Sequence, residues 1–455
     1  MMKRILILCS AAALLAGCHI YKPYSRSDVQ TDGLYGQDVP ADDTSSIASL
    51  PWTELFTDVQ LQPLIREGLA NNTDLGIARL RVKEAEATLQ SSRLAYLPSL
   101  SLNPQGQLSS YDGAKTDKTY HIAASAAWEV DLFGKLTNAK RGAKAALEQS
   151  EAYRQAVQTQ LIATIANSYY NLLTLDRQLD ISSRTAESWA EVLRTYEAKL
   201  QVGEATEAAV AQARASKLSV EASVLTLQKQ IRAQENSLSI LLGRVPGSIE
   251  RTTLDGQRFP DTLAVGVPLQ LLGRRPDVRQ AEAALAQAFY NTNAARSAFY
   301  PSITLSGSAG WTNNNGAAIV NPGNWLLSAI GSLTQSLFNR GQNITNLRIA
   351  KARQEEALLS FRQSLLKAGC EVNDALMQWQ TANSRLKIIA EQVTSLRTAV
   401  DNTQQLMEFS NSASYLEVLT ARQALLQAEL TETNDRFDQI QGIINLYHSL
   451  GGGAE

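Results

Sequence analysis

Alternation of apolar and small polar residues predicts strands in four segments of this chain. The ranges are about 99–110, 119–132, 301–312 and 324–338. The alternation is clearest in the second segment, where Tyr120, Ile122 and Trp128 are separated by residues such as His121 and Ser125. Strands of about ten residues with one apolar face suit a bilayer-spanning barrel. A soluble antiparallel sheet packed on helices shows the same alternation, so the pattern leaves both interpretations open.

Apolar residues also recur at helical spacing over very long ranges. Four long helices are predicted, at 136–202, 205–242, 342–410 and 414–448. The first contains no proline, and about 65 helical residues extend roughly 100 Å. In the third, apolar residues follow alternating steps of three and four, which is the heptad spacing of a left-handed coiled coil. Taken alone, this region also fits a plain coiled-coil stalk. The seam residues are Leu358, Phe361, Leu365, Ala368, Val372, Ala375, Trp379, Ala382, Leu386, Ile389, Val393, Leu396 and Val400.

The two halves of the chain repeat one another. Asp74 and Pro98 have counterparts 203 residues later, at Asp277 and Pro301, and in both places a helix runs into a strand. Self-similarity at a fixed spacing indicates a tandem duplication. We therefore predict one repeat over 51–250 and a second over 251–455.

The first residues have the pattern of a bacterial lipoprotein signal. Two basic residues precede an apolar run that is too short to span a membrane, and small residues lead to Cys18. We predict a signal peptide over 1–17, a lipid on the Cys18 thiol and a polar tether over 18–50. The alternative is an ordinary secretory signal with a chance cysteine. His19 follows the cysteine, where an Asp would favour the inner membrane, so the outer membrane is favoured.

Composition narrows the possible functions. The formal net charge is −2 without a long basic run, which argues against nucleic acid as a partner. The three histidines lack metal-ligand spacing, and neither a phosphate-binding loop nor a nucleophile motif is found. We therefore expect neither an enzyme, nor a metal site, nor a cofactor other than the covalent lipid. Cys370 lies in a helical pattern and is expected to be buried and free of disulfides.

Strand number limits the membrane interpretation. Four strands cannot close a membrane barrel, whose minimum is about eight. Either several copies share one barrel or the chain forms none.

The combination of motifs is similar to the TolC/NodT family of outer-membrane efflux lipoproteins. It comprises the lipoprotein signal, the repeat, the Arg-Pro-Asp-Val segment at 275–278, Phe-Tyr-Pro-Ser-Ile at 299–303 and the Leu-Gly-Gly-Gly near the C-terminus. The resemblance implies a mostly α, α+β membrane protein. In that family three protomers share a twelve-stranded transmembrane β-barrel that continues into a trimeric α-helical tunnel.

The resemblance also implies where the functional residues lie. The periplasmic gate corresponds to Tyr415, Leu416, Glu417 and Thr420, with Thr420 standing where many members have a second acid. A ring of Glu417 carboxylates would narrow the pore. The alternative is that Ser414 and Glu417 form a capping box at a helix start. The adaptor-docking tips correspond to Val202, Gly203, Thr206, Asn411 and Ser414, in turns that a helical hairpin would also require.

Three functions from different classes follow. The first is an outer-membrane exit channel that passively conducts small molecules, such as drugs or other toxic compounds. Its implied partners are two sister copies in a homotrimer, a periplasmic adaptor, an inner-membrane pump of the RND type or another exporter, and outer-membrane lipid. The alternatives are an outer-membrane duct for protein secretion and a coiled-coil lipoprotein without a channel. We favour small-molecule efflux.

Overall fold

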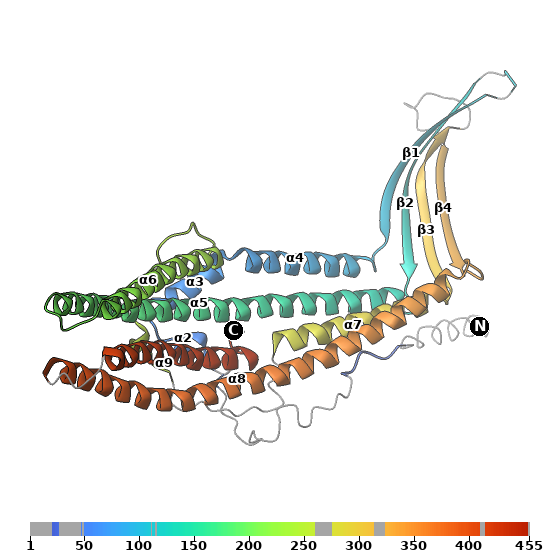
Figure 1. Ribbon diagram of the computed structural model, residues 1–455. Coiled ribbons are helices and arrows are strands. Elements are labelled where there is room, and N and C mark those ends of the chain that lie inside the picture. Colours follow the sequence, from blue (N-terminus) through green and yellow to red (C-terminus); the bar gives the residue numbers. More distant parts are fainter. Residues whose placement is uncertain are drawn as a thin grey trace. The chain divides into compact units, whose positions relative to one another are not determined.

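The computed structural model describes residues 21–26, 47, 50–110, 112–113, 116–259, 275–313, 324–409 and 415–453. The order of elements along the chain is clear in Figure 1. Before the first strand lie α2 (Trp52–Leu55), α3 (Leu61–Asn71) and α4 (Thr73–Leu94). Then follow β1 (Ser99–Ser109), β2 (Asp117–Val130), α5 (Lys135–Gln201), α6 (Glu207–Leu241), η2 (Leu254–Gly256), α7 (Pro276–Ser297), β3 (Ser302–Asn313), β4 (Asn324–Thr334), α8 (Gln342–Phe409) and α9 (Tyr415–Ser449).

The two longest helices carry most of the chain. α5 has 67 residues and α8 has 68, and proline interrupts neither of them. α6 and α9 have 35 residues each. The structure thus has helices close to the four ranges that the helical periodicity predicts. None of the helices in the described ranges is long and apolar enough to cross a membrane.

Packing of α8 follows the heptad seam. Most of the seam residues are buried, including Phe361, Val372 and Val393. Cys370 is exposed, so the expectation that it is buried was wrong. It lies two positions from both Ala368 and Val372, which places it about 200° around the helix from each of these seam residues. A helical pattern alone does not say which face a small residue occupies.

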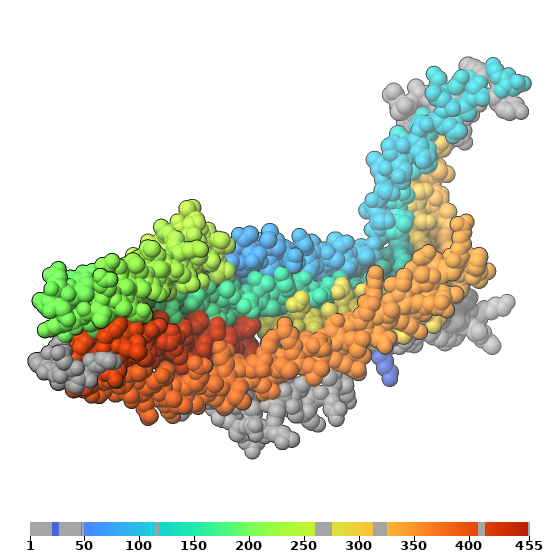
Figure 2. Space-filling view, viewed as in Figure 1, coloured from blue at the N-terminus to red at the C-terminus, as the bar shows by residue number. Residues whose placement is uncertain are grey.

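The four strands form one antiparallel sheet in the order β1-β2-β3-β4. The outer pairs are the two predicted hairpins, in which Leu102 pairs with Ala124 and Leu305 with Gly331. The central pair joins the two repeats, with Ser125 opposite Ser308. β1 and β4 are the edge strands, and β1 lies along the near edge in Figure 2.

The chain divides into two compact units that do not follow the predicted repeats. The first unit combines residues 1–29, 80–152 and 279–364, and the second combines 30–79, 153–278 and 365–455. Each unit takes segments from both halves of the sequence because strands and helices of the two repeats pack on one another. In the second unit the largest buried side chains include Tyr169 and Tyr170 on α5.

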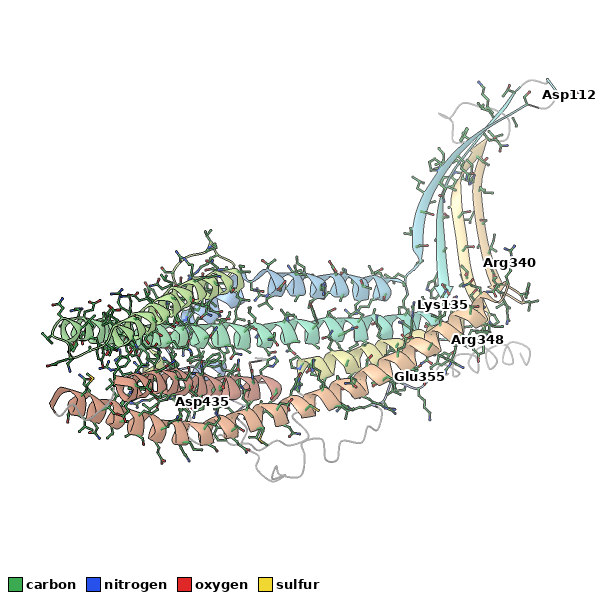
Figure 3. All side chains as sticks on the ribbon, in the orientation of Figure 1. Asp112, Lys135, Arg340, Arg348, Glu355 and Asp435 are labelled. Atoms are coloured by element: carbon green, nitrogen blue, oxygen red, sulfur yellow. The ribbon has the colours of Figure 1, made fainter. Side chains whose placement is uncertain are left out.

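Ion pairs and tight contacts also stabilise each unit. In the second unit, Asp435, which is labelled in Figure 3, is almost fully buried and pairs with Arg385 at 2.7 Å. In the first unit, Lys135 at the start of α5 pairs with Glu129 of β2 at 2.8 Å.

Candidate functional site

The turn between α5 and α6 has the geometry predicted for a helix tip. Gly203 has φ +79°, and a Cβ added to it would meet nothing within 4 Å, so glycine is required here by backbone conformation. The backbone N–H of Glu204 donates to the carbonyl of Lys199 at 2.8 Å. The Thr206 hydroxyl accepts from the N–H of Ala209 at 3.2 Å and caps α6. Val202 is 71% exposed at this tip.

The turn between α8 and α9 lies largely outside the described residues. Asn411 and Ser414 are among those not described. The docking role predicted for them, and the capping box predicted for Ser414 with Glu417, therefore stay predictions.

Three of the four predicted gate residues on the first turns of α9 are exposed, and the fourth, Tyr415, packs between helices. Leu416, Glu417 and Thr420 are exposed, and the Thr420 hydroxyl donates to the Leu416 carbonyl at 2.7 Å. Val418 and Leu419 face the other way and are buried. The three exposed residues therefore lie on one side of α9, opposite the buried Val418 and Leu419.

Tyr415 packs between the helices instead. Its ring meets that of Tyr196 on α5 edge to face, with centroids 4.8 Å apart. The Tyr196 hydroxyl donates to the Met407 sulfur of α8 at 2.9 Å, and burial raises the pKa of Tyr196 to about 12. Tyr415 belongs to the same cluster as Ala213 and Val210 of α6. In this chain it therefore links α5, α6, α8 and α9 rather than lying with Leu416 and Glu417.

Sequence reasoning missed Arg422, about two turns beyond Tyr415 on α9. Its guanidinium donates to the Ser188 hydroxyl of α5 and, at 2.7 Å, to the Gln404 side-chain oxygen of α8. The repeat held a usable signal. In the helical hairpins the two repeats align at a spacing of 208 residues, so Arg422 corresponds to Arg214. Arg214 has an acidic partner in Glu197. The residue that corresponds to Glu197 in the second repeat is Gln405, which is neutral.

The sheet presents two chemically different faces. One face carries large apolar side chains that are mostly exposed, among them Leu100, Leu102, Trp325, Leu327 and Leu333. Trp311 and Trp325 lie opposite one another there, with ring centroids 5.0 Å apart. An exposed apolar surface of this kind marks an interaction site for membrane or protein.

The other face carries a ladder of small polar groups. The hydroxyls of Ser101 and Ser125 lie 2.8 Å apart, as do those of Ser308 and Ser328. Asn103 donates to the Ser125 hydroxyl at 2.9 Å. These groups suit contact with water, so the alternation predicted from the sequence corresponds to one apolar and one mainly polar face.

The segment after Cys18 lies against the first unit, although Cys18 itself is outside the described residues. The backbone N–H of Tyr24 donates to the Tyr290 hydroxyl of α7 at 3.2 Å. Arg26 pairs with Glu282 at 3.1 Å and stacks over Phe361 of α8. Residues 21–26 therefore hold the chain close to α7 and α8, a few residues beyond the predicted lipid.

Two titratable groups in the second unit have pKa values that are shifted by their surroundings. Burial alone would raise the pKa of Asp58, but hydrogen bonds from Thr252, the Gln60 backbone and Gln257 lower it. Burial also lowers the pKa of His448, which lies near Arg275. In the part of the chain that the structure describes, no three His, Cys, Asp or Glu side chains are grouped to hold a metal ion.

Sequence similarity to known proteins identifies the family. The model of the outer membrane efflux protein family matches residues 64–244 and 267–452, which is most of the chain.

Individual relatives cover nearly the whole length. The cation efflux system protein CusC of Escherichia coli K12 is 28% identical over 99% of both chains. The probable outer membrane lipoprotein SilC of Salmonella typhimurium is 29% identical over 100% of this chain and 99% of that protein. The open-state crystal structure of the Neisseria gonorrhoeae MtrE outer membrane channel has a TM-score of 0.85 and 26% identity, covering 95% of this chain and 98% of that one. This chain therefore belongs to the outer membrane efflux protein family.

Proposed function

We propose that three copies of this chain form an exit duct in the outer membrane for small molecules. The observation that carries the proposal is the sheet, which combines an exposed apolar face, a polar face and two edge strands. Among the described residues, β1 and β4 each have one neighbouring strand only. Unpaired strand edges are very costly in a bilayer because no water satisfies their N–H and C=O groups. Pairing β4 of one copy with β1 of the next removes every edge.

Strand number and length support three copies. The strands have 11, 14, 12 and 11 residues, and a tilted strand needs about 9–11 to cross the hydrocarbon core. Three copies supply twelve strands, which exceeds the minimum of about eight for a closed barrel. The apolar face then meets lipid, and the serine ladder lines a wet lumen. The long helices of the three copies continue the lumen as a periplasmic tunnel.

The proposal assigns roles to both ends of the protein. A lipid on Cys18 anchors each copy in the outer membrane, next to the segment 21–26 that is held against α7 and α8. At the helix tips, exposed Leu416, Glu417 and Thr420 line the narrowest point of the closed tunnel. The tips, including Val202 and Gly203, receive a periplasmic adaptor, and a pump of the RND type or another exporter supplies the energy.

Disulfide cross-linking between copies tests the shared barrel. With Cys370 replaced by serine, a cysteine at Gln105 in β1 is combined with cysteines scanned along β4. We expect at least one pair to give cross-linked dimers and trimers in membranes. The control carries cysteines at Ser125 and Ser308, which face each other within one chain. It should stay monomeric in size. Monomers from every β1–β4 pair, together with no conductance in planar bilayers, would end the proposal.

Cargo needs a separate test. A deletion strain should accumulate dyes and drugs, and complementation should restore their export. A secretion defect without any accumulation would instead favour a duct for proteins.

A further inference from the structure

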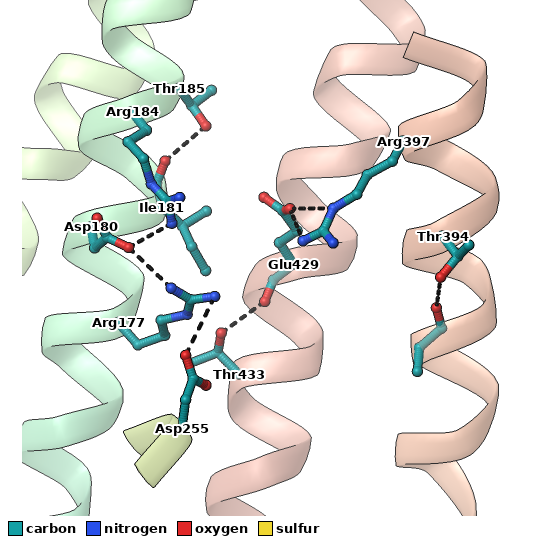
Figure 4. A network of polar contacts seen from close by, with 11 residues as sticks. Arg177, Asp180, Ile181, Arg184, Thr185, Asp255, Thr394, Arg397, Glu429 and Thr433 are labelled. Atoms are coloured by element: carbon teal, nitrogen blue, oxygen red, sulfur yellow. Dashed lines mark hydrogen bonds and ion pairs between the residues drawn. The ribbon is translucent and has the colours of Figure 1, made fainter. Parts of the chain in front are cut away.

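A cavity of about 350 Å³ lies between α5, α8 and α9 in the second unit. This volume is within the range of small-ligand sites. Figure 4 shows the arginines of α5 and α8 at this place, together with their acidic partners. The lining residues that carry charge are Arg177, Arg184, Arg397, Arg422, Asp401 and Glu429.

Three of the four arginines have carboxylate partners. Arg177 and Arg184 both contact Asp180, at 3.1 and 2.5 Å, and Arg397 contacts Glu429 at 2.7 Å. Arg177 also approaches Asp255 of η2 at 3.6 Å. Figure 4 shows these pairs, in which Asp180 lies beside Arg177 and Arg184, and Glu429 lies beside Arg397.

Arg422 differs from the other three. Within the described residues, no carboxylate oxygen lies within 4.0 Å of its guanidinium. Its two hydrogen-bond partners, Ser188 and Gln404, are neutral, and its Nε has no acceptor among the described residues. Burial lowers the pKa of Arg422, whereas Tyr196, Glu191 and Asp401 act in the opposite direction. An arginine nevertheless stays charged in proteins, so the cavity holds a cation without a direct counter-ion.

The duplicated half provides an internal comparison. Arg214, the counterpart of Arg422, is paired with Glu197 at 2.8 Å. In the second half both Gln404 and Gln405 lie where such a carboxylate would stand. A partly buried charge without an ionic partner is costly, and it is retained only where something offsets the cost.

We propose that this cavity binds a small oxyanion of the phosphate or carboxylate class. Guanidinium groups bind such anions through paired, charge-assisted hydrogen bonds. An anion held by Arg422 and by the arginines of α5 and α8 would connect the α5–α6 hairpin to the α8–α9 hairpin. The proposal rests on the contacts of Arg422 and not on the proposed duct, so each can fail without the other.

The test measures thermal unfolding of the purified full-length protein in detergent at constant ionic strength. Inorganic phosphate, succinate and chloride are compared as titrants. We expect a saturable rise in unfolding temperature with phosphate or succinate but not with chloride. The Arg422→Gln variant should bind about tenfold to a hundredfold more weakly, which corresponds to the loss of one hydrogen bond to a charged group.

Two further variants test whether the oxyanion response depends on Arg422 lacking a carboxylate partner. Arg214→Gln removes the counterpart arginine, which already pairs with the Glu197 carboxylate. This variant should therefore leave the oxyanion response intact. Gln404→Glu supplies Arg422 with a carboxylate and should abolish the response while the protein stays folded. A response confined to phosphate or to succinate identifies the anion. An equal response in the wild type, Arg422→Gln and Gln404→Glu, or no saturable response to either oxyanion, would overturn the proposal.

Discussion

The contact between α8 and α9 at Gly442 makes the sharpest stability prediction. A Cβ added to Gly442 would lie 2.9 Å from both the backbone nitrogen and the Cα of Trp379. Both are main-chain atoms of a helix, so they cannot move aside as the end of a flexible side chain can. In the Gly442→Ala variant the two helices must separate locally.

The expected magnitude combines two opposing terms. Overpacking of a close contact costs about 1–3 kcal/mol. Alanine in place of glycine inside a helix contributes about 1 kcal/mol of stability. Gly76 in α4 isolates the second term, because a Cβ there would meet nothing within 4 Å. We therefore expect Gly442→Ala to be about 1–3 kcal/mol less stable than Gly76→Ala.

Hydrogen exchange of backbone amides is the suitable assay. It reports local opening and does not need the whole protein to unfold in a two-state manner. The amides of α9 near Gly442 should exchange faster in Gly442→Ala, whereas those of α4 should exchange at the same rate or more slowly in Gly76→Ala. If both alanine variants are equally protected, the two helices are not in close contact at this point, and the reasoning fails.

Three further predictions concern other parts of the chain. Gly203→Ala should destabilise the α5–α6 tip by about 1–2 kcal/mol because φ is positive there, and Gly203→Asn by less; exchange at 200–206 measures both. Cys18→Ser should remove the lipid, which mass spectrometry of the mature protein detects. If the masses of the wild type and the variant differ only by the Cys-to-Ser exchange, the protein is not lipidated. Asp58→Asn should reduce stability at neutral pH. Because folding lowers the Asp58 pKa, its contribution is present above 3.8, the unfolded value, and is lost as pH falls through the folded value. Acid titrations of the two proteins should therefore converge, and parallel curves would contradict this.

Long-range periodicity made the helices and strands predictable. The heptad seam of α8 and the alternation in β2 each repeat over many residues, so single exceptions do not hide them. The turn between α5 and α6 was also predictable, since glycine ends a helix and a threonine three residues later can cap the next one. Trimer, barrel and gate stay proposals, because one chain does not contain the contacts that define them.

Other features depend on tertiary partners that a residue type does not reveal. Tyr415 was predicted as a gate residue, and that role stays a prediction; its packing on Tyr196, a residue more than 200 positions away in the sequence, could not be inferred from the sequence. Arg422 was overlooked because an arginine in a helix is usually solvated. The repeat places Gln405 where Glu197 pairs with Arg214 in the first half, but only the structure shows that Ser188 and Gln404 lie beside Arg422. Cys370 was misplaced for the same reason.

The pairing of β2 with β3 has a consequence for biogenesis. These strands come from different halves of the chain, and α5, α6 and α7 are made between them. The first hairpin therefore exists for a time with an apolar face and a bare edge, long before its neighbour has been synthesised. Such a hairpin is prone to aggregate. The nascent protein must be shielded until its C-terminal half arrives, so dependence on a holding chaperone should follow from strand order alone.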